Sequence, residues 1–461
     1  MPDCLIPADA GIRSIPVDTV TAERLPALLN ALLPQASVWL GATGFGARAG
    51  EIALVPDPDG GVARVLLGVG SGRDVSPLIA GKLPATLPAG AYHLREGFQD
   101  ESLATLAWAL GAYTFTRYRN AAARPRLVVP QNVEAKDVGA IADGVYLTRD
   151  MINAAANDLG PAELAKVAAD LARQHGAVFS ETIGDKLLGG GFNLIHAVGA
   201  AASAARAPRL IDLSWGDERN PRITIVGKGV CFDTGGVDLK TAAGMLLMKK
   251  DMGGAANALG LAHMIMNAGL KLRLRVLIPA VENAISSDSF RPGDVFTARN
   301  GVTVEIGNTD AEGRLILADA LSLASEEQPD LLVDLATLTG AARTALGPDI
   351  VPFYVADDDL AADFHRCGEA VADPVWRLPL WRPYASFLDS TVAEINNVGV
   401  SPFAGSILAA LFLARFVPEG VCWLHTDIYA WNPKTQPGKP EGGEAQAIRA
   451  LFALLKNRYP A

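Results

Sequence analysis

The sequence contains few cysteines and few histidines, and this scarcity disfavours several kinds of site. Its four cysteines, Cys4, Cys231, Cys367 and Cys422, lie far apart and form no CxxC pair. We therefore expect reduced thiols rather than a disulfide framework. The six histidines form no HExxH motif and no close pair, so each is expected to have a structural role. A metal site, if there is one, should be built mainly from other ligands.

The sequence also lacks long apolar runs and an excess of positive charge. No stretch approaches the roughly 20 apolar residues of a membrane span. The N-terminal residues MPDCLIPADAG carry acids and a proline where a signal peptide needs basic residues and an apolar run. The formal net charge is −10 and the pI is about 5.2. These features predict a cytoplasmic protein with no membrane partner, for which nucleic acid is an unlikely partner.

The 461 residues, half of them hydrophobic, are enough for a large core. In residues 1–130, short apolar runs such as Arg64–Gly70 alternate with amphipathic stretches such as Glu101–Phe115. This pattern predicts a small N-terminal α/β accessory domain, and no chemical motif stands out in it. Residues 131–160 are expected to form a linking helix, because the pattern over Lys136–Asp158 is helical. Residues 161–461 then form the second, larger domain.

In this larger domain, strand and helix patterns alternate. Pro161 near the start and Gly176 after the end delimit one predicted helix. Further along, Arg222–Gly227 and Leu272–Asn283 are typical of strands, and Met252–Gly269 is typical of a helix. The alternation predicts an α/β fold with a mostly parallel central sheet flanked by helices. In such sheets the functional sites lie beyond the carboxyl ends of the strands.

Acidic and basic residues gather in three segments at predicted strand ends or helix starts. The first segment is VGKGVCFDTGG, the second is VDLKTAAGMLLMKKDMGG and the third is NTDAEGRL. In order, they supply Lys228 and Asp233, then Lys240 and Asp251, then Asp310, Glu312 and Arg314.

Each of these residues alone has an ordinary explanation. Asp251 could cap a helix, and Asp310 and Glu312 could complement a helix dipole. The lysines and Arg314 could be solvated surface residues. If the four acids converge, however, each close pair repels by about 4 kcal/mol at 4 Å and an effective dielectric near 20. Divalent cations relieve such repulsion, and an oxygen-rich site suits Mn, Mg or Zn in a paired arrangement.

With these motifs the sequence resembles the leucyl aminopeptidase family, the two-metal cytosolic aminopeptidases. NTDAEGRL is identical to the signature octapeptide of that family. The blocks VGKG, FDTGG, MKKDMGGAA, PAVEN, RPGDV and DLATLTGA also match in order and spacing. The resemblance covers residues 153–416 well and the remaining C-terminal residues in part. It implies that residues 161–461 are a catalytic metallo-aminopeptidase domain and that the N-terminal domain is macro-like.

The resemblance also implies individual roles. Asp233 and Glu312 would bridge two divalent metal ions per subunit, manganese or zinc or one of each. Asp310 would complete one metal site. The second, tighter site would be completed by Lys228 and Asp251, and Lys228 would have to be neutral, with its pKa depressed by the metals.

Two further residues would act in catalysis. Lys240 would polarise the scissile carbonyl, and Arg314 would hold a bicarbonate ion that acts as general base, or steady the gem-diolate. The implied activity is release of N-terminal amino acids from peptides with a free N-terminus, by attack of a hydroxide that bridges the metals. The implied assembly is a homohexamer, and the implied substrate-binding residues are Met248, Asn308, Thr337, Leu338, Gly340 and Tyr429.

The C-terminal block HTDIYAWNP departs from the usual pattern. By position, Tyr429 replaces a small residue of the side-chain pocket and Asn432 replaces a methionine-like one. Our hypothesis is a narrower, more polar pocket that favours small or polar N-terminal residues over leucine. Alternatively, Tyr429 points into the core and the backbone shifts to compensate.

Two other functions remain open at this point. A two-metal hydrolase of another ester or amide, such as a phosphatase, would use similar carboxylates, but Lys228 as a ligand and the lack of nearby histidines argue against it. A non-catalytic or DNA-binding relative should have lost a ligand, yet all five are present. The net charge also disfavours DNA.

Overall fold

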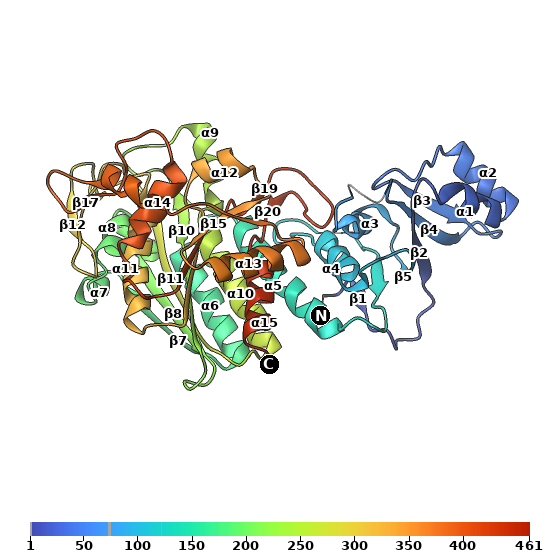
Figure 1. Ribbon diagram of the computed structural model, residues 1–461, viewed down its shortest axis with the longest axis horizontal. Coiled ribbons are helices and arrows are strands. Elements are labelled where there is room, and N and C mark those ends of the chain that lie inside the picture. Colours follow the sequence, from blue (N-terminus) through green and yellow to red (C-terminus); the bar gives the residue numbers. More distant parts are fainter. Residues whose placement is uncertain (1, 72–74, 121) are drawn as a thin grey trace. The chain divides into compact units, whose positions relative to one another are not determined.

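The computed structural model describes residues 2–71, 75–120 and 122–461 and divides into two compact units (Figure 1). The first unit comprises Met1–Tyr146 and Lys434–Glu441, and the second comprises Leu147–Pro433 and Gly442–Ala461. The division falls inside helix α5 (Ala135–Asn153), within the segment for which the sequence predicts a linking helix. The return of residues 434–441 to the first unit has no counterpart in the sequence patterns.

The first unit is α/β. Its described residues form a six-stranded sheet in which every pairing is parallel except that of the edge strand β3 with β4. The predicted strand and helix of this unit correspond to β4 and α4, and Asp100 caps α4 by accepting a hydrogen bond from the backbone N–H of Leu103. In order across the sheet the strands are β1 (Leu5–Ile6), β6 (Arg126–Val128), β5 (Ala91–Glu96), β2 (Ile15–Val20), β4 (Val62–Gly68) and β3 (Ile52–Pro56). The helices are α1 (Leu25–Ala31), α2 (Pro34–Ala42), η1 (Ile79–Lys82), α3 (Leu83–Thr86) and α4 (Glu101–Ala112).

A nine-stranded, mostly parallel sheet is the centre of the described part of the second unit, as predicted. Its order is β16 (Val375–Arg377), β15 (Val351–Val355), β18 (Trp423–Asp427), β14 (Leu331–Ala336), β9 (Arg222–Gly227), β11 (Arg273–Asn283), β8 (Arg209–Trp215) and β7 (Val178–Ile183), with β10 (Gly229–Asp233) also paired to β11. Strands β18, β14, β9, β11 and β10 run parallel to one another. Antiparallel pairings join β15 to β18, β8 to β11 and β7 to β8.

Helices cover both faces of this sheet (Figure 1). One face carries α6 (Pro161–His175), α10 (Gly253–Ala268), α13 (Asp358–Ala370) and α15 (Ile448–Arg458), and the other carries α8 (Asn193–Gly199), α11 (Glu312–Glu326) and α14 (Gly405–Ala414). Helix α6 begins at Pro161, whose missing N–H costs nothing at that position. It ends at Gly176, which adopts the left-handed conformation with φ 67°. Both limits agree with the predicted ones.

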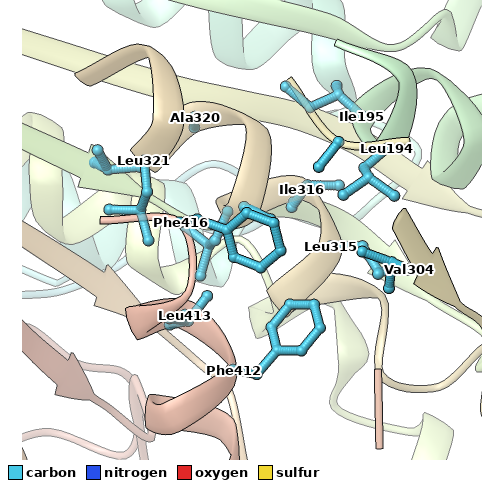
Figure 2. Packing of buried hydrophobic residues seen from close by; sticks show 14 of the residues in the cluster. Leu194, Ile195, Val304, Leu315, Ile316, Ala320, Leu321, Phe412, Leu413 and Phe416 are labelled. Atoms are coloured by element: carbon cyan, nitrogen blue, oxygen red, sulfur yellow. The ribbon is translucent and has the colours of Figure 1, made fainter. Parts of the chain in front are cut away.

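Helix α11 is embedded in the core that fills one face of the sheet. Figure 2 shows its side chains packed against α8, β13 (Thr303–Glu305), α14 and the turn after α14. Each large aliphatic side chain buried here contributes roughly 1.5–3 kcal/mol. This packing fixes the first turn of α11, which carries Glu312 and Arg314. The labelled members of the cluster are Leu194, Ile195, Val304, Leu315, Ile316, Ala320, Leu321, Phe412, Leu413 and Phe416.

The remaining elements of the second unit are short. They are α7 (Lys186–Gly189), η2 (Ala204–Arg206), α9 (Ala242–Met245), η3 (Met248–Lys250), β12 (Val295–Thr297), α12 (Gly340–Leu346), η4 (Arg382–Leu388), β17 (Ile395–Asn396), β19 (Trp431–Asn432) and β20 (Gly442–Gly443). None of the helices formed by the described residues has the length and apolar character needed to cross a membrane.

Candidate active site

The candidate site lies where parallel strands of the large sheet end. Lys228 occupies the break between β9 and β10, and Asp233 is the last residue of β10. Thr337 directly follows β14, and Asp427 ends β18. Because these strands run parallel, their carboxyl ends share one edge of the sheet, the position at which such folds bind ligands. The lysine and the acid, five residues apart in sequence, reach this edge together.

Lys228 is buried among two carboxylates and a carbonyl. Its Nζ lies 2.9 Å from Asp251 Oδ2 and 3.0 Å from Glu312 Oε1. It also donates a hydrogen bond to the backbone carbonyl of Thr337 at 2.8 Å. The hydroxyl of Thr337 donates to Asp251 Oδ1 at 2.8 Å and so fixes that carboxylate. Lys228 therefore is not the solvated surface lysine that a single-residue interpretation would suggest.

Lys240 forms the second ion-paired group. Its Nζ lies 2.7 Å from Asp233 Oδ2 and also pairs with Asp310. Asp233 uses its other oxygen, Oδ1, to accept hydrogen bonds from the backbone N–H of Gly235 and from the side-chain amide of Asn283. Four acids and two lysines thus alternate in one cluster.

Local hydrogen bonds hold the NTDAEGRL turn against the loop that follows β10. The hydroxyl of Thr309 donates to the carbonyl of Gly235 at 2.6 Å, and Asp238 Oδ2 accepts from the backbone N–H of Thr309 at 2.8 Å. Gly235 has φ 89°, in the left-handed region that glycine adopts without strain. Asn308 Oδ1 accepts from the backbone N–H of Asp310, which sets the course of the turn toward α11.

The pKa values of the acids reflect crowding in a buried site. Burial, and then the neighbouring carboxylate of Asp251, raise the pKa of Asp233 to about 6. Burial and Asp233 raise the pKa of Glu312 well above its usual value. Burial acts in the same direction on Asp251, but Lys228 and Lys250 outweigh it and the net pKa is lowered. The cluster therefore holds more negative charge than its surroundings accommodate easily.

Lys228 is protonated in this arrangement. Burial disfavours its charge, but the carboxylates of Asp251, Glu312 and Asp233 outweigh burial and raise its pKa above the usual value. This is the opposite of the depressed pKa that a metal-ligating amine requires. A bound cation would have to displace the proton, so metal binding and proton release are coupled at this position.

The donor set fits divalent cations. Asp233, Asp310 and Glu312 each offer a carboxylate oxygen, and these oxygens lie within 4.8 Å of one another. Asp251 Oδ2 and Glu312 Oε1 are buried and have no hydrogen-bond donor of suitable geometry, although the Lys228 ammonium lies near both. Hard oxygen ligands with unfilled bonding capacity are what manganese, magnesium and zinc accept in paired sites.

The cluster lines a cavity of about 410 Å³. Every residue that the sequence predicts as a metal ligand, a catalytic residue or a substrate-binding residue borders this one cavity. These residues are Lys228, Asp233, Lys240, Met248, Asp251, Asn308, Asp310, Glu312, Arg314, Thr337, Leu338, Gly340 and Tyr429. Asn432 is buried but is not among the lining residues. Asn432 therefore does not form part of the wall of this cavity.

Two residues hold the walls of the cavity in position, and the sequence analysis did not indicate either of them. Asp427 Oδ1 accepts hydrogen bonds from the backbone N–H groups of Leu338 and Thr339, both at 3.0 Å. Asn397 accepts from the backbone N–H of Gly307 through Oδ1 and from Arg314 Nη1 through its carbonyl. Burial lowers the pKa of Arg314 to about 10, so its guanidinium stays charged at neutral pH.

Tyr429 lines the cavity, and its ring contacts two cations. Lys250 Nζ lies 5.0 Å from the ring centroid and Arg343 Cζ lies 4.5 Å from it. Burial lowers the pKa of Lys250 to about 8, and the ammonium form therefore prevails at neutral pH. Gln446 Oε1 accepts hydrogen bonds from the backbone N–H groups of Tyr429 and Ala430 and holds the segment in place. Lys250, Arg343 and Gln446 also line the cavity and were not predicted.

Comparison with known families identifies both units. Residues 146–452 match the model of the cytosol aminopeptidase family, catalytic domain. Residues 15–130 match that of the M17 aminopeptidase N-terminal domain. The chain belongs to the cytosol aminopeptidase family. The resemblance stated from the sequence motifs is thereby confirmed.

Individual relatives agree with this assignment. A probable cytosol aminopeptidase of Stenotrophomonas maltophilia (strain K279a) is 46% identical over 63% of this chain and 58% of its own length. One of Corynebacterium diphtheriae is 36% identical over 91% of this chain and 87% of its own length. In the first three curated relatives, the match spans 58% to 64% of the relative.

Two solved structures show the same fold. The cytosol aminopeptidase of Coxiella burnetii has a TM-score of 0.94 at 46% identity, over 99% of this chain and all of that one. The bottromycin maturation enzyme BotP in complex with Mn has a TM-score of 0.87 at 31% identity, over 97% of this chain and all of that one.

Gly313 of the family octapeptide leaves room for the Lys228 side chain. A Cβ at position 313 would lie 2.4 Å from Lys228 Cε and 2.6 Å from its Nζ. We expect Gly313→Ala to displace that lysine and to weaken metal binding about 10- to 100-fold, the range for disturbed metal-site geometry. Metal titration followed by calorimetry measures the change. Gly189→Ala is the matched control, since a Cβ there meets nothing within 4 Å. Equal metal affinity in both variants would contradict the assignment of Lys228.

Proposed function

We propose that this chain is a metal-dependent aminopeptidase that releases N-terminal amino acids from peptides. The observation that carries the proposal is the single cavity bordered by Lys228, Asp233, Asp251, Asp310 and Glu312 together with Lys240 and Arg314. Five candidate ligands and two cationic groups in one cavity, within the segment that matches the family, support hydrolysis of the family's type.

Two divalent ions, manganese or zinc, would be held by Lys228, Asp233, Asp251, Asp310 and Glu312 and would supply an activated water as nucleophile at neutral pH. The similar protein BotP has been solved in complex with Mn, which supports manganese as the metal bound by this chain. Glu312, buried beside Lys228, and Asp233, buried beside Lys240, would each contact both ions. Asp310 has the most exposed carboxylate of the three clustered acids, which suits an ion that exchanges readily.

Other residues of the chain stabilise the transition state, supply the general base and bind the substrate. Lys240 donates a hydrogen bond to the developing oxyanion of the scissile carbonyl. Arg314, which is buried and donates to the carbonyl of Asn397, would hold a bicarbonate ion that supplies a general base, or would itself steady the gem-diolate. The 337–340 segment, fixed by Asp427, together with Met248 and Asn308, lines the side on which the substrate lies.

Family membership supports three further parts of the proposal. The substrates are peptides with a free N-terminus, because the free, neutral α-amine would bind one of the two metal ions. The enzyme assembles as a homohexamer. It acts in the cytoplasm, in keeping with the name of the family and with the expected reduced thiols.

Recognition of the free α-amine tests the proposed function. Leucyl anilide should be hydrolysed by the metal-loaded enzyme, whereas N-acetyl-leucyl anilide should not be cleaved, because its acylated nitrogen can no longer bind a metal. Release of the anilide chromophore measures both rates. Equal hydrolysis of the two substrates would rule out an aminopeptidase, and cleavage of neither would rule out a peptidase of this type.

A further inference from the structure

Lys250 is a buried cation that has no acidic group of the described chain within ion-pair distance. It ends the 3-10 helix η3, its residue is 6% exposed, and its ammonium group lies over the Tyr429 ring at the wall of the cavity. No hydrogen bond or ion pair within the described chain joins its Nζ to an acceptor. A buried ammonium that lacks such a partner is unfavourable unless a ligand supplies the negative charge.

Arg343 brings a second positive charge to the same ring. It belongs to α12, and its Cζ lies 4.5 Å from the centroid of Tyr429. Within the described residues, its guanidinium has no acidic partner either. Lys228 and Arg343 are close enough to disfavour the charge of Lys250, whereas Asp251 and Asp427 favour it. Cation–π contacts with one tyrosine offset only part of this repulsion.

The two acids nearest to Lys250, Asp251 and Asp427, already accept hydrogen bonds from other groups. Asp251 accepts from the Thr337 hydroxyl and faces Lys228. Asp427 accepts from two backbone N–H groups through Oδ1 and from the Thr339 and Ser406 hydroxyls through Oδ2. Neither is within ion-pair distance of Lys250. An added anion would therefore neutralise positive charge on the Lys250–Tyr429–Arg343 wall.

The position of Lys250 indicates which part of a substrate supplies this anion. Lys250 is adjacent in sequence to the candidate ligand Asp251, and it borders the cavity although the residue is only 6% exposed. The chain of a peptide must lead away from the metals toward solvent. The side chain of the N-terminal residue is the part that remains in the enclosed space. A C-terminal carboxylate is excluded there for any peptide longer than a dipeptide.

We propose that the Lys250–Tyr429–Arg343 wall forms a subsite for an acidic side chain, so that N-terminal glutamate or aspartate is preferred. The carboxylate accepts charge-assisted hydrogen bonds from Lys250 and, toward the cavity mouth, from the exposed Arg343. Tyr429 keeps both cations in place and fills the volume that a leucine side chain would need. This inference rests on the proposed aminopeptidase function and names its substrate class.

Paired isosteric substrates test the inference. With the metal-loaded full chain, kcat/KM is measured for glutamyl, glutaminyl and leucyl anilides, none of which has a C-terminal carboxylate. Glutamyl anilide should exceed glutaminyl anilide by about 10-fold or more, because a charge-assisted hydrogen bond replaces a neutral one. A ratio of one or below, with hydrolysis still measurable, overturns the acidic subsite and leaves the aminopeptidase proposal intact. Failure to cleave any of the three overturns both.

Variants locate the preference in named residues. Lys250→Met and Arg343→Met should each bring the glutamyl-to-glutaminyl ratio toward one. Because the ratio is measured on one enzyme sample, a general loss of activity does not affect it. Lys249→Met is the matched control, since Lys249 lies on the same helix but donates to the carbonyl of Asn153. It should keep the ratio of the unmodified enzyme.

Two outcomes of the variant series decide the assignment. An unchanged ratio in both Lys250→Met and Arg343→Met overturns it. If Lys250→Met is too impaired to assay, the ratio in Arg343→Met decides by itself, because this side chain is exposed and its replacement is compatible with folding.

Discussion

Replacement of Lys240 by alanine is expected to lower kcat about 10²- to 10³-fold while both metal sites stay filled. That range is the usual effect of removing one donor from an oxyanion site. Burial disfavours the charge of Lys240, but Asp233 and Asp310 outweigh it and raise its pKa, so the ammonium donor is present throughout the neutral range. Metal ions bound to these acids would neutralise them and would leave the ammonium free to face the substrate carbonyl.

Comparison with Asp233→Ala separates catalysis from metal binding. Asp233 offers an oxygen to the acidic cluster, so its loss should empty the site as well as abolish turnover. Elemental analysis of both variants, beside steady-state kinetics, gives the two readouts. Lys166→Ala removes an exposed lysine of α6 and should change neither quantity. Equal loss of metal in Lys240→Ala and Asp233→Ala would contradict the division of roles.

The position of the site could be predicted from the sequence because several of its residues lie close together in one short motif. NTDAEGRL supplies Asp310, Glu312 and Arg314 within one turn before α11, and glycines mark the close approaches around them. The parallel sheet followed from the alternation of strands and helices, and a parallel sheet brings the separate segments to one edge. The resemblance to a known family then supplied roles that no pattern of residues could.

The ordinary role expected for each charged residue on its own was the least accurate prediction from the sequence. Asp251 resembles a helix cap, yet the residue at the N-cap of α10 is Met252 and no side chain caps that helix. Lys228 and Arg314 resemble surface residues, yet both are buried. Tertiary packing decides these cases, because the partners of each side chain come from segments that are distant in sequence.

The missed residues have long-range partners for the same reason. Asp427 fixes a loop that lies about 90 positions earlier, and Asn397 fixes the octapeptide turn from a similar distance. Lys250 and Arg343 meet only through Tyr429, which comes from a third segment. Neither the hydrophobic periodicity of the sequence nor a local motif predicts such long-range contacts. Only the departure of Tyr429 from a small residue was visible in the sequence.

Removal of all metal is expected to abolish hydrolysis. In the metal-free chain the ammonium groups of Lys228 and Lys240 are held as counter-ions of the acids. No other group that lines the described cavity is placed to lower the pKa of an attacking water, which bound metal brings from 15.7 to about 7. The loss should therefore exceed that of Lys240→Ala, which leaves the nucleophile in place.

The central claim is that the acidic cluster works as a two-metal hydrolytic site, and reconstitution tests it most directly. The enzyme is stripped with a chelator, checked for residual metal and assayed with leucyl and glutamyl anilides as Mn²⁺ or Zn²⁺ is added back. We predict no hydrolysis by the stripped enzyme and recovery that reaches its plateau at two metal ions per subunit. Full activity of the rigorously metal-free enzyme would contradict the account.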